Sequence, residues 1–88
     1  MKYKQKPDIV YETIDGELIL LHPDNGKMLV LNEAGTQLWN FLKEWLSIDD
    51  LVARFTAVYE AKPAQVHPDI NQFVNSLNQK GLLDVQIQ

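Results

Sequence analysis

The stretch that decides the fold is GELILLHPDNGKMLVLNEAGTQLWNFLKEWL, which runs from Gly16 to Leu46. Two apolar segments, Glu17–Leu21 and Lys27–Leu31, flank the turn Pro23–Gly26, where proline presets a backbone angle and Asn-Gly tolerates positive φ. The pattern predicts an antiparallel hairpin that runs directly into a helix. The unbroken apolar run Leu18–Leu21 predicts that both faces of its strand are covered.

A further strand is predicted ahead of the hairpin. Ile9–Ile14 is rich in β-branched and aromatic residues, and the Asp-Gly pair that follows it is a turn signal. The lysine-rich start of the chain, residues 2–6, is instead expected to be a solvated tail. Three consecutive antiparallel strands are therefore expected.

The first helix is predicted to follow the hairpin at once. Asn32 is suited to cap it, and Glu33 is placed to meet the positive end of the helix dipole. Helical spacing predicts an apolar face made of Ala34, Leu38, Trp39, Phe41, Leu42, Trp45 and Leu46.

A second helix is predicted to be capped by Ser47, with Asp49 and Asp50 in its first turn. Two adjacent acids there complement the helix dipole and point about 100° apart, which disfavours a shared metal ion. Its apolar face is predicted to comprise Ile48, Leu51, Val52, Phe55, Val58 and Tyr59.

A third helix is predicted to begin between Pro63 and Pro68, because proline is accepted in a first turn but not later. It is expected to end at Gly81. The residues expected to face the core are Ile70, Phe73, Val74 and Leu77, and a short apolar tail with Leu82, Leu83 and Val85 is expected to cover the bottom of the core.

The order of elements predicts an α+β fold in which a small three-stranded antiparallel sheet is followed by three helices in a winged-helix-like arrangement. The 88 residues fit a single domain, 1–88, with a core from about 9 to 85.

Composition excludes several classes of function. The chain has no cysteine, and its 8 basic against 12 acidic residues give a net charge of −4, which argues against nucleic-acid binding. No apolar run approaches the roughly 20 residues of a bilayer span, and no signal-peptide pattern is present. We therefore expect a cytoplasmic protein without membrane or nucleic-acid partners.

The residues offer no catalytic constellation. His22 lies beside a turn proline and is expected to face solvent, and His67 is expected next to the start of a helix, where it caps the helix rather than binds metal. No nucleophile and base stand in a recognisable relation, and the four glycines are scattered. We predict a non-enzyme with no catalytic residues, no metal site and no cofactor.

The strand Lys27–Leu31 is a candidate for peptide binding, because an edge strand carries unpaired amides and carbonyls to which an extended peptide can add. Met28 is adaptable, which suits such a surface. Alternation sends about half of the strand's side chains into the core in any case.

Three segments in order resemble the coenzyme PQQ synthesis protein D (PqqD) family, small domains also called recognition elements of ribosomally made, modified peptides (RiPPs). They are Gly16–Leu21 with Met28–Leu42, then Ile48–Val52, then Val66–Val74 with Leu77 and Gly81–Leu83, which is similar to the family's Asp-Val-x-x-Phe-Leu-x-x-Leu and Gly-Leu-Leu ending. The resemblance covers about residues 9–85.

The resemblance implies that the domain binds the leader segment of a precursor peptide and presents it, as a peptide chaperone, to a modifying enzyme. In this family the leader lies along the third strand, in a groove closed by the third helix. The positions carried over are Lys27, Met28, Leu29, Val30 and Leu31 on the strand and Asp69, Gln72, Phe73 and Ser76 on the helix.

Two of these helix positions have alternative interpretations. Asp69 is either a cap of the helix or a partner for a basic leader residue, and Phe73 is more typical of the core than of a contact surface. Pro68, directly before Asp69, departs from the family pattern and affects where the helix starts, and therefore which residues line the groove.

Two other functions remain open, a winged-helix DNA-binding regulator and a structural subunit of a larger maturation complex. The first predicts a basic recognition helix, whereas residues 66–80 carry one lysine against one aspartate.

For a leader-binding domain the partner enzyme is open too: PQQ maturation implies a radical SAM protein, and lasso-peptide maturation implies a leader peptidase. The sequence names neither the peptide nor the oligomeric state.

Overall fold

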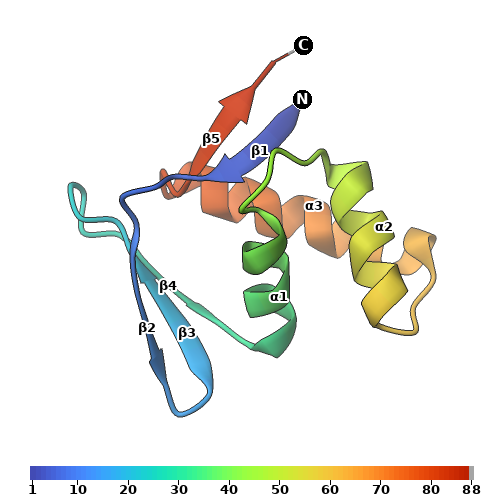
Figure 1. Ribbon diagram of the computed structural model, residues 1–88, viewed down its shortest axis with the longest axis horizontal. Coiled ribbons are helices and arrows are strands. Elements are labelled where there is room, and N and C mark those ends of the chain that lie inside the picture. The colour runs from blue at the N-terminus through green and yellow to red at the C-terminus, as the bar shows by residue number, and fades with distance from the viewer. Residues whose placement is uncertain (88) are drawn as a thin grey trace.

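The computed structural model describes residues 1–87, so the last residue of the predicted domain, Gln88, lies outside the described part. Within residues 1–87 the chain forms five strands and three helices (Figure 1). They are β1 (Lys2–Gln5), β2 (Val10–Ile14), β3 (Glu17–Leu21), β4 (Met28–Leu31), α1 (Glu33–Phe41), α2 (Ile48–Val58), α3 (Pro63–Gln79) and β5 (Leu83–Gln86). The predicted α+β class is confirmed.

The predicted three-stranded antiparallel sheet is present, in the order β2-β3-β4. β2 and β3 are joined by Asp15 and Gly16, both with positive φ (52° and 81°), as a tight two-residue hairpin requires. β3 and β4 are in register with Leu18 opposite Leu31. β4 therefore lies at an edge of the sheet, immediately before α1.

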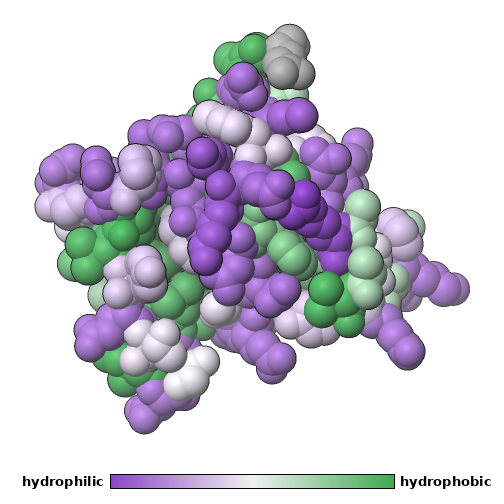
Figure 2. Space-filling model, in the orientation of Figure 1, coloured by the Kyte–Doolittle hydropathy of each residue, from purple (hydrophilic) through white to green (hydrophobic). Residues whose placement is uncertain are grey.

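Only one face of this sheet is covered. Leu18 and Leu20 are buried on the inner face, whereas Leu21 on the outer face is exposed. The prediction that both faces of β3 are covered is wrong, because the helices that build the core lie on the inner side. The exposed apolar side chains of the outer face are Val10, Ile14, Leu21, Met28 and Val30. Figure 2 shows hydrophobic surface gathered over the sheet, at the left of the view.

The two ends of the chain form a second sheet that the sequence patterns did not predict. β1 pairs antiparallel with β5, with Lys2 opposite Gln86 (Figure 1). Tyr3 is buried at 8% exposure, and Lys6 Nζ lies 3.0 Å from a carboxylate oxygen of Asp84. The expected solvated tail at residues 2–6 is therefore a strand, and the expected covering tail is its partner.

α1 is shorter than its apolar spacing predicts. It ends at Phe41, and the backbone of the following residues bonds to β1 instead: Gln5 N donates to Leu42 O (2.7 Å), and Tyr3 and Leu46 exchange both main-chain bonds (2.8 and 3.0 Å). Trp45 consequently leaves the predicted apolar face and is 37% exposed, with Lys4 Nζ 6.0 Å from its ring centre. Tertiary pairing here overrides helical periodicity.

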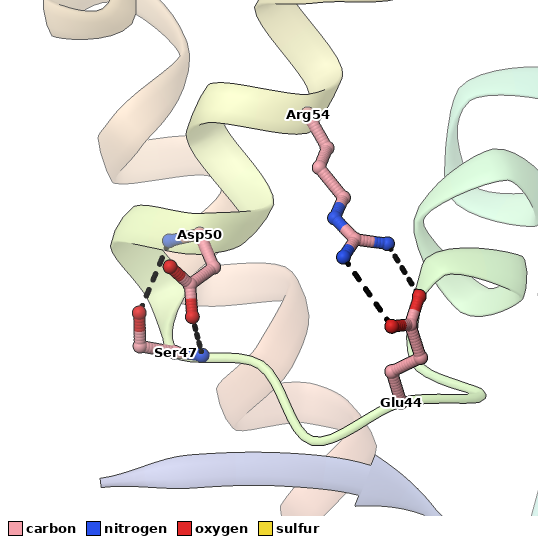
Figure 3. Close-up of polar contacts among 4 residues, drawn as sticks. All are labelled: Glu44, Ser47, Asp50 and Arg54. Atoms are coloured by element: carbon pink, nitrogen blue, oxygen red, sulfur yellow. Dashed lines mark hydrogen bonds and ion pairs between the residues drawn. The ribbon is translucent and has the colours of Figure 1, made fainter.

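The start of α2 is built as predicted. Ser47 Oγ accepts from Asp50 N and Ser47 N donates to Asp50 Oδ2, both at 3.0 Å, which is a reciprocal capping box. Arg54 on the same helix donates to both carboxylate oxygens of Glu44, at 2.6 and 3.5 Å (Figure 3). Both pairs tie the α1–α2 connection to the second helix.

The capping box predicts a dependence of stability on pH. The hydrogen bonds from Ser47 hold the pKa of Asp50 below its ordinary value of 3.8. A lowered folded-state pKa contributes stability that is present above the unfolded value and is lost as the pH falls through the folded value. We expect the free energy of unfolding, measured in urea, to fall below about pH 5, and to fall less steeply in Asp50→Asn. An unchanged slope in Asp50→Asn would contradict this account.

α3 begins at Pro63, the first of the two positions predicted, with Pro68 inside the helix. Asp69 is therefore in the helix interior, so the interpretation of Asp69 as a cap is wrong. His67 is likewise within the helix rather than at its cap, with Nε2 3.5 Å from Asp49 Oδ1. The buried face of the helix carries Ile70, Val74 and Leu77, as predicted.

The core lies between the inner face of the sheet and the three helices. Its fully buried side chains are Leu20, Leu42, Leu51, Val74, Leu77 and Leu82. Val58, which was predicted to face the core from α2, is instead 58% exposed at the end of that helix. None of the helices described between residues 1 and 87 combines the length and apolar composition needed to span a bilayer.

Candidate functional site

A cleft of about 560 Å³ opens beside β4, between this strand and α3. The elements around it are the ends of β3 and β4, the start of α1, Phe55 of α2 and one face of α3. Its lining residues are Glu17, Leu29, Val30, Leu31, Asn32, Ala34, Gly35, Leu38, Phe55, Val66, Asp69, Ile70, Phe73 and Ser76. Most of this lining is apolar.

The main chain of β4 faces the cleft with unpaired groups. Along an antiparallel pair, residues bonded to the neighbouring strand alternate with residues whose N–H and C=O point away from it. The bond from His22 N to Lys27 O (2.9 Å) fixes the phase of this alternation. Every second residue from Lys27 bonds to β3, so Met28 and Val30 direct their main-chain groups to the free edge.

The side chains of β4 alternate between two surfaces. Leu31 is buried and Leu29 half-buried on the inner side, whereas Met28 and Val30 are 56% and 48% exposed on the outer side. The predicted division of this strand into core and surface positions is confirmed. The free edge thus has apolar side chains on both sides.

α3 supplies the opposite wall. Val66, Asp69, Ile70, Phe73 and Ser76 recur at spacings of three or four residues, so they share one face of the helix and line the cleft. Phe73 is half-buried and reaches both the core and the cleft.

The predicted peptide-binding residues do not all line the same surface. Six of its members line this cleft: Leu29, Val30, Leu31, Asp69, Phe73 and Ser76. Lys27 and Met28 instead line an adjoining hollow with Ser76, Gln79 and Lys80. Gln72 is exposed and lines neither of these two surfaces.

Sequence reasoning missed the contributions of α1 and α2. Gly35, Leu38 and Phe55 form the far end of the cleft. A Cβ added at Gly35 would lie 3.4 Å from the Leu31 side chain, so glycine allows α1 to approach β4 closely. The early glycine in α1 was the available signal for this approach, whereas the other two residues were indistinguishable from ordinary core positions.

The turn between β3 and β4 is fixed to the end of α3. Asn25 Nδ2 donates to Lys80 O (3.3 Å), and Asn25 Oδ1 accepts from Lys27 N (2.8 Å). His22, predicted to face solvent, is half-buried there, and its Nδ1 accepts from the main-chain N–H of Asp24 and Asn25. The Asn25–Lys80 bond joins the turn to the carboxyl end of α3, and the other bonds define the conformation of the turn itself.

The cleft combines a mostly apolar lining with a free strand edge. Its lining offers apolar side chains, two carboxylates, Asn32 and Ser76, with no histidine or lysine among the residues that line it. An open strand edge beside an apolar groove is the arrangement that binds extended peptides by strand addition.

Comparison with protein families gives one match. The family described as coenzyme PQQ synthesis protein D (PqqD) matches residues 17–83, which include β3, β4, the three helices and the whole cleft. The comparison with curated proteins gave no match.

Three solved structures share the fold. TbiB1, determined in complex with the TbiA(beta) leader peptide, is 28% identical to this chain, with a TM-score of 0.79, and the alignment covers 97% of this chain and 99% of TbiB1. A lasso peptide synthetase B1, complexed with its leader peptide, is 24% identical with a TM-score of 0.78 over 97% and 100% of the two chains. The PqqD part of Methylobacterium extorquens PqqCD, a stand-alone RiPP recognition element, is 16% identical with a TM-score of 0.75 over 96% and 89%.

Proposed function

Because the chain belongs to the coenzyme PQQ synthesis protein D (PqqD) family, we propose that it is a RiPP recognition element that binds the leader segment of a precursor peptide as an added strand on β4. The likeness to TbiB1, whose structure was determined with a leader peptide, supports this function, and the alignment covers 97% of this chain.

The observation that carries the proposal is the free edge of β4 beside an apolar cleft. Met28 and Val30 offer two sets of main-chain N–H and C=O groups to an incoming strand. Each hydrogen bond made there contributes about 1 kcal/mol net, and burial of the peptide's apolar side chains contributes about 25 cal/mol per Å².

The added strand is antiparallel to β4, since antiparallel ladders are slightly more stable per residue. Alternate side chains of the peptide then enter the cleft between β4 and α3, against Leu31, Ile70 and Phe73. The others lie over the outer face, beside Met28 and Val30. Specificity in this arrangement comes from the side chains that enter the cleft.

The biological role that follows is that of a non-catalytic chaperone for the precursor. The chain, with β1 as part of its core, acts as one recognition domain. The partner is a maturation enzyme such as a radical SAM protein or a leader peptidase. The hydrogen bond from Asn25 to Lys80, which joins the β3–β4 turn to α3 within this chain, supports a stand-alone binder over a structural subunit.

An NMR titration tests the proposal. The uniformly ¹⁵N-labelled domain is titrated with a synthetic leader of the precursor peptide encoded beside its gene, and with a scrambled peptide of equal composition as control. We expect the amides of Met28–Leu31 and of α3 to shift together and to saturate only with the leader. Shifts elsewhere, or none until a partner enzyme is added, would contradict the proposal and favour the structural subunit.

A further inference from the structure

The charges along the cleft are separated by sign from one end to the other. We propose that the leader segment bound here is bipolar, with a basic residue beside the Leu31 end of β4, an acidic residue beside the Met28 end and apolar residues between them. The inference rests on the proposed function and deepens it, because it specifies the chemical class of peptide that the cleft selects.

One end of the cleft is acidic. Of the residues that line the main cleft, Glu17 and Asp69 are the charged ones, and both are exposed. Glu17 begins β3, which brings it next to the end of β4, and Asp69 lies in the amino-terminal half of α3. A basic side chain of the peptide would meet two carboxylates there.

The other end is basic. Lys27 and Lys80 are the charged residues of the adjoining hollow, which they line with Met28, Ser76 and Gln79. Ser76 lines both hollows, so the two surfaces join along the same edge of β4. Neither these lysines nor the two carboxylates form an ion pair with another side chain of residues 1–87.

The helix dipole of α3 opposes this arrangement but is too weak to cancel it. The carboxyl end of a helix carries about half a negative charge, against two full positive charges on Lys27 and Lys80. The carbonyl of Lys80, at that end, also accepts a hydrogen bond from Asn25. The sign of each end is therefore set by its side chains.

Helix geometry gives the spacing of the two charges. A rise of about 1.5 Å per residue places Asp69 and Lys80 roughly 16 Å apart along α3. An extended peptide advances about 3.3 Å per residue and only alternate side chains face the cleft, so its basic and acidic residues stand about four or six positions apart. Because the peptide is antiparallel to β4, the basic residue comes first in its sequence.

Three designed peptides of about ten residues test the charge order. All have the same alternating Leu/Thr body. The forward peptide has Lys near its amino end and Glu about four positions later, on the same face of the strand. The reversed peptide exchanges these two residues, and the third has Gln at both. We expect fluorescence anisotropy at low salt to give about tenfold tighter binding of the forward than of the reversed peptide, with the neutral peptide between them. At 1 M salt, where screening acts within about 3 Å, the difference should shrink to roughly twofold or less.

Variants of the domain assign the effect to individual residues. Asp69→Asn should weaken binding of the forward peptide about threefold and leave binding of the neutral peptide unchanged. Asp49→Asn, an exposed aspartate on α2 outside both hollows, is the matched control. The exchange D69K/K80E leaves one charge of each sign at either end, beside Glu17 and Lys27, and should abolish the preference between the forward and reversed peptides.

The outcomes separate this inference from the proposed function. If all three peptides bind equally and shift the amides of Met28 and Val30, or if the reversed peptide binds best, the charge order is overturned and strand addition stands. If none of the peptides, nor the natural leader, shifts those amides, the proposed function fails and the inference fails with it.

Discussion

Val30→Pro is expected to weaken leader binding by about 2 kcal/mol or more, roughly thirtyfold in Kd. The N–H of Val30 faces the free edge of β4 and is not used by β3, so proline removes a donor that only the peptide needs. Proline is tolerated at such edge positions, because the neighbouring ladder loses no bond. The leader carbonyl opposite Val30 is left without a partner in a partly dry cleft, which is costly.

The same substitution at the opposite edge of the sheet is the control. By the same alternation, Thr13 of β2 directs its N–H to the other free edge, away from the cleft. Thr13→Pro should bind leader as the wild type does. Binding is measured by calorimetry and folding by thermal melting. Equal loss of affinity in both variants, or retained affinity in Val30→Pro, would show that β4 is not where the peptide adds.

Leu77→Ala is expected to destabilise the domain by about 2 to 5 kcal/mol. The Leu77 side chain is fully buried on the core face of α3 near the carboxyl end of the helix, so its truncation leaves a cavity that the tightly packed surroundings cannot close. Domains of this size have a total stability of about 5 to 15 kcal/mol, so this variant loses a large part of it. Urea unfolding followed by circular dichroism measures the change.

Val58→Ala provides the comparison for Leu77→Ala. Its spacing in α2 matches the core face, but the side chain is 58% exposed where the helix ends. We expect a change within about 0.5 kcal/mol, as for other surface positions. A loss comparable to that of Leu77→Ala would mean that Val58 is buried in solution.

Local signals decided most of the fold. The Asp15-Gly16 turn and Asn32 at the helix start are read from a few neighbouring residues, and the structure has each of them where the sequence places it. Ser47 at the start of α2 is another such signal. Each depends on backbone chemistry within four residues, and for that reason none needed knowledge of the rest of the chain.

The errors at residues 2–6 and at Trp45 involve partners far away in the sequence. The segment around Tyr3 has a single apolar residue among polar ones, too weak a pattern to predict a strand, and becomes one only because Leu83–Gln86 pairs with it. Trp45 has helical spacing, but the main chain of the neighbouring Leu46 forms hydrogen bonds to Tyr3 instead of continuing the helix. Apolar spacing predicts which side chains share a face of a helix. It does not predict which main-chain groups form hydrogen bonds to a distant strand.

The residues of the candidate site were also predicted only in part. The alternation of Met28–Leu31 and the wall residues Asp69 and Ser76 were predicted from the pattern of the chain and its family resemblance. Phe55 was not, because its approach to the cleft depends on how α2 packs across α3. Gln72 was included although it points to solvent, since one step along a helix turns a side chain by about 100°.

The ribbon of β1 and β5 places both ends of the chain at one corner of the molecule. Lys2 is paired with Gln86, so their Cα atoms are about 5 Å apart, and no residue of either strand lines the main cleft. A linker of a few glycines could therefore join the two ends into a circle, and new ends could be cut in the exposed loop between α2 and α3. The domain is therefore suited to circular permutation, or to insertion into a surface loop of another protein, with its peptide cleft left accessible.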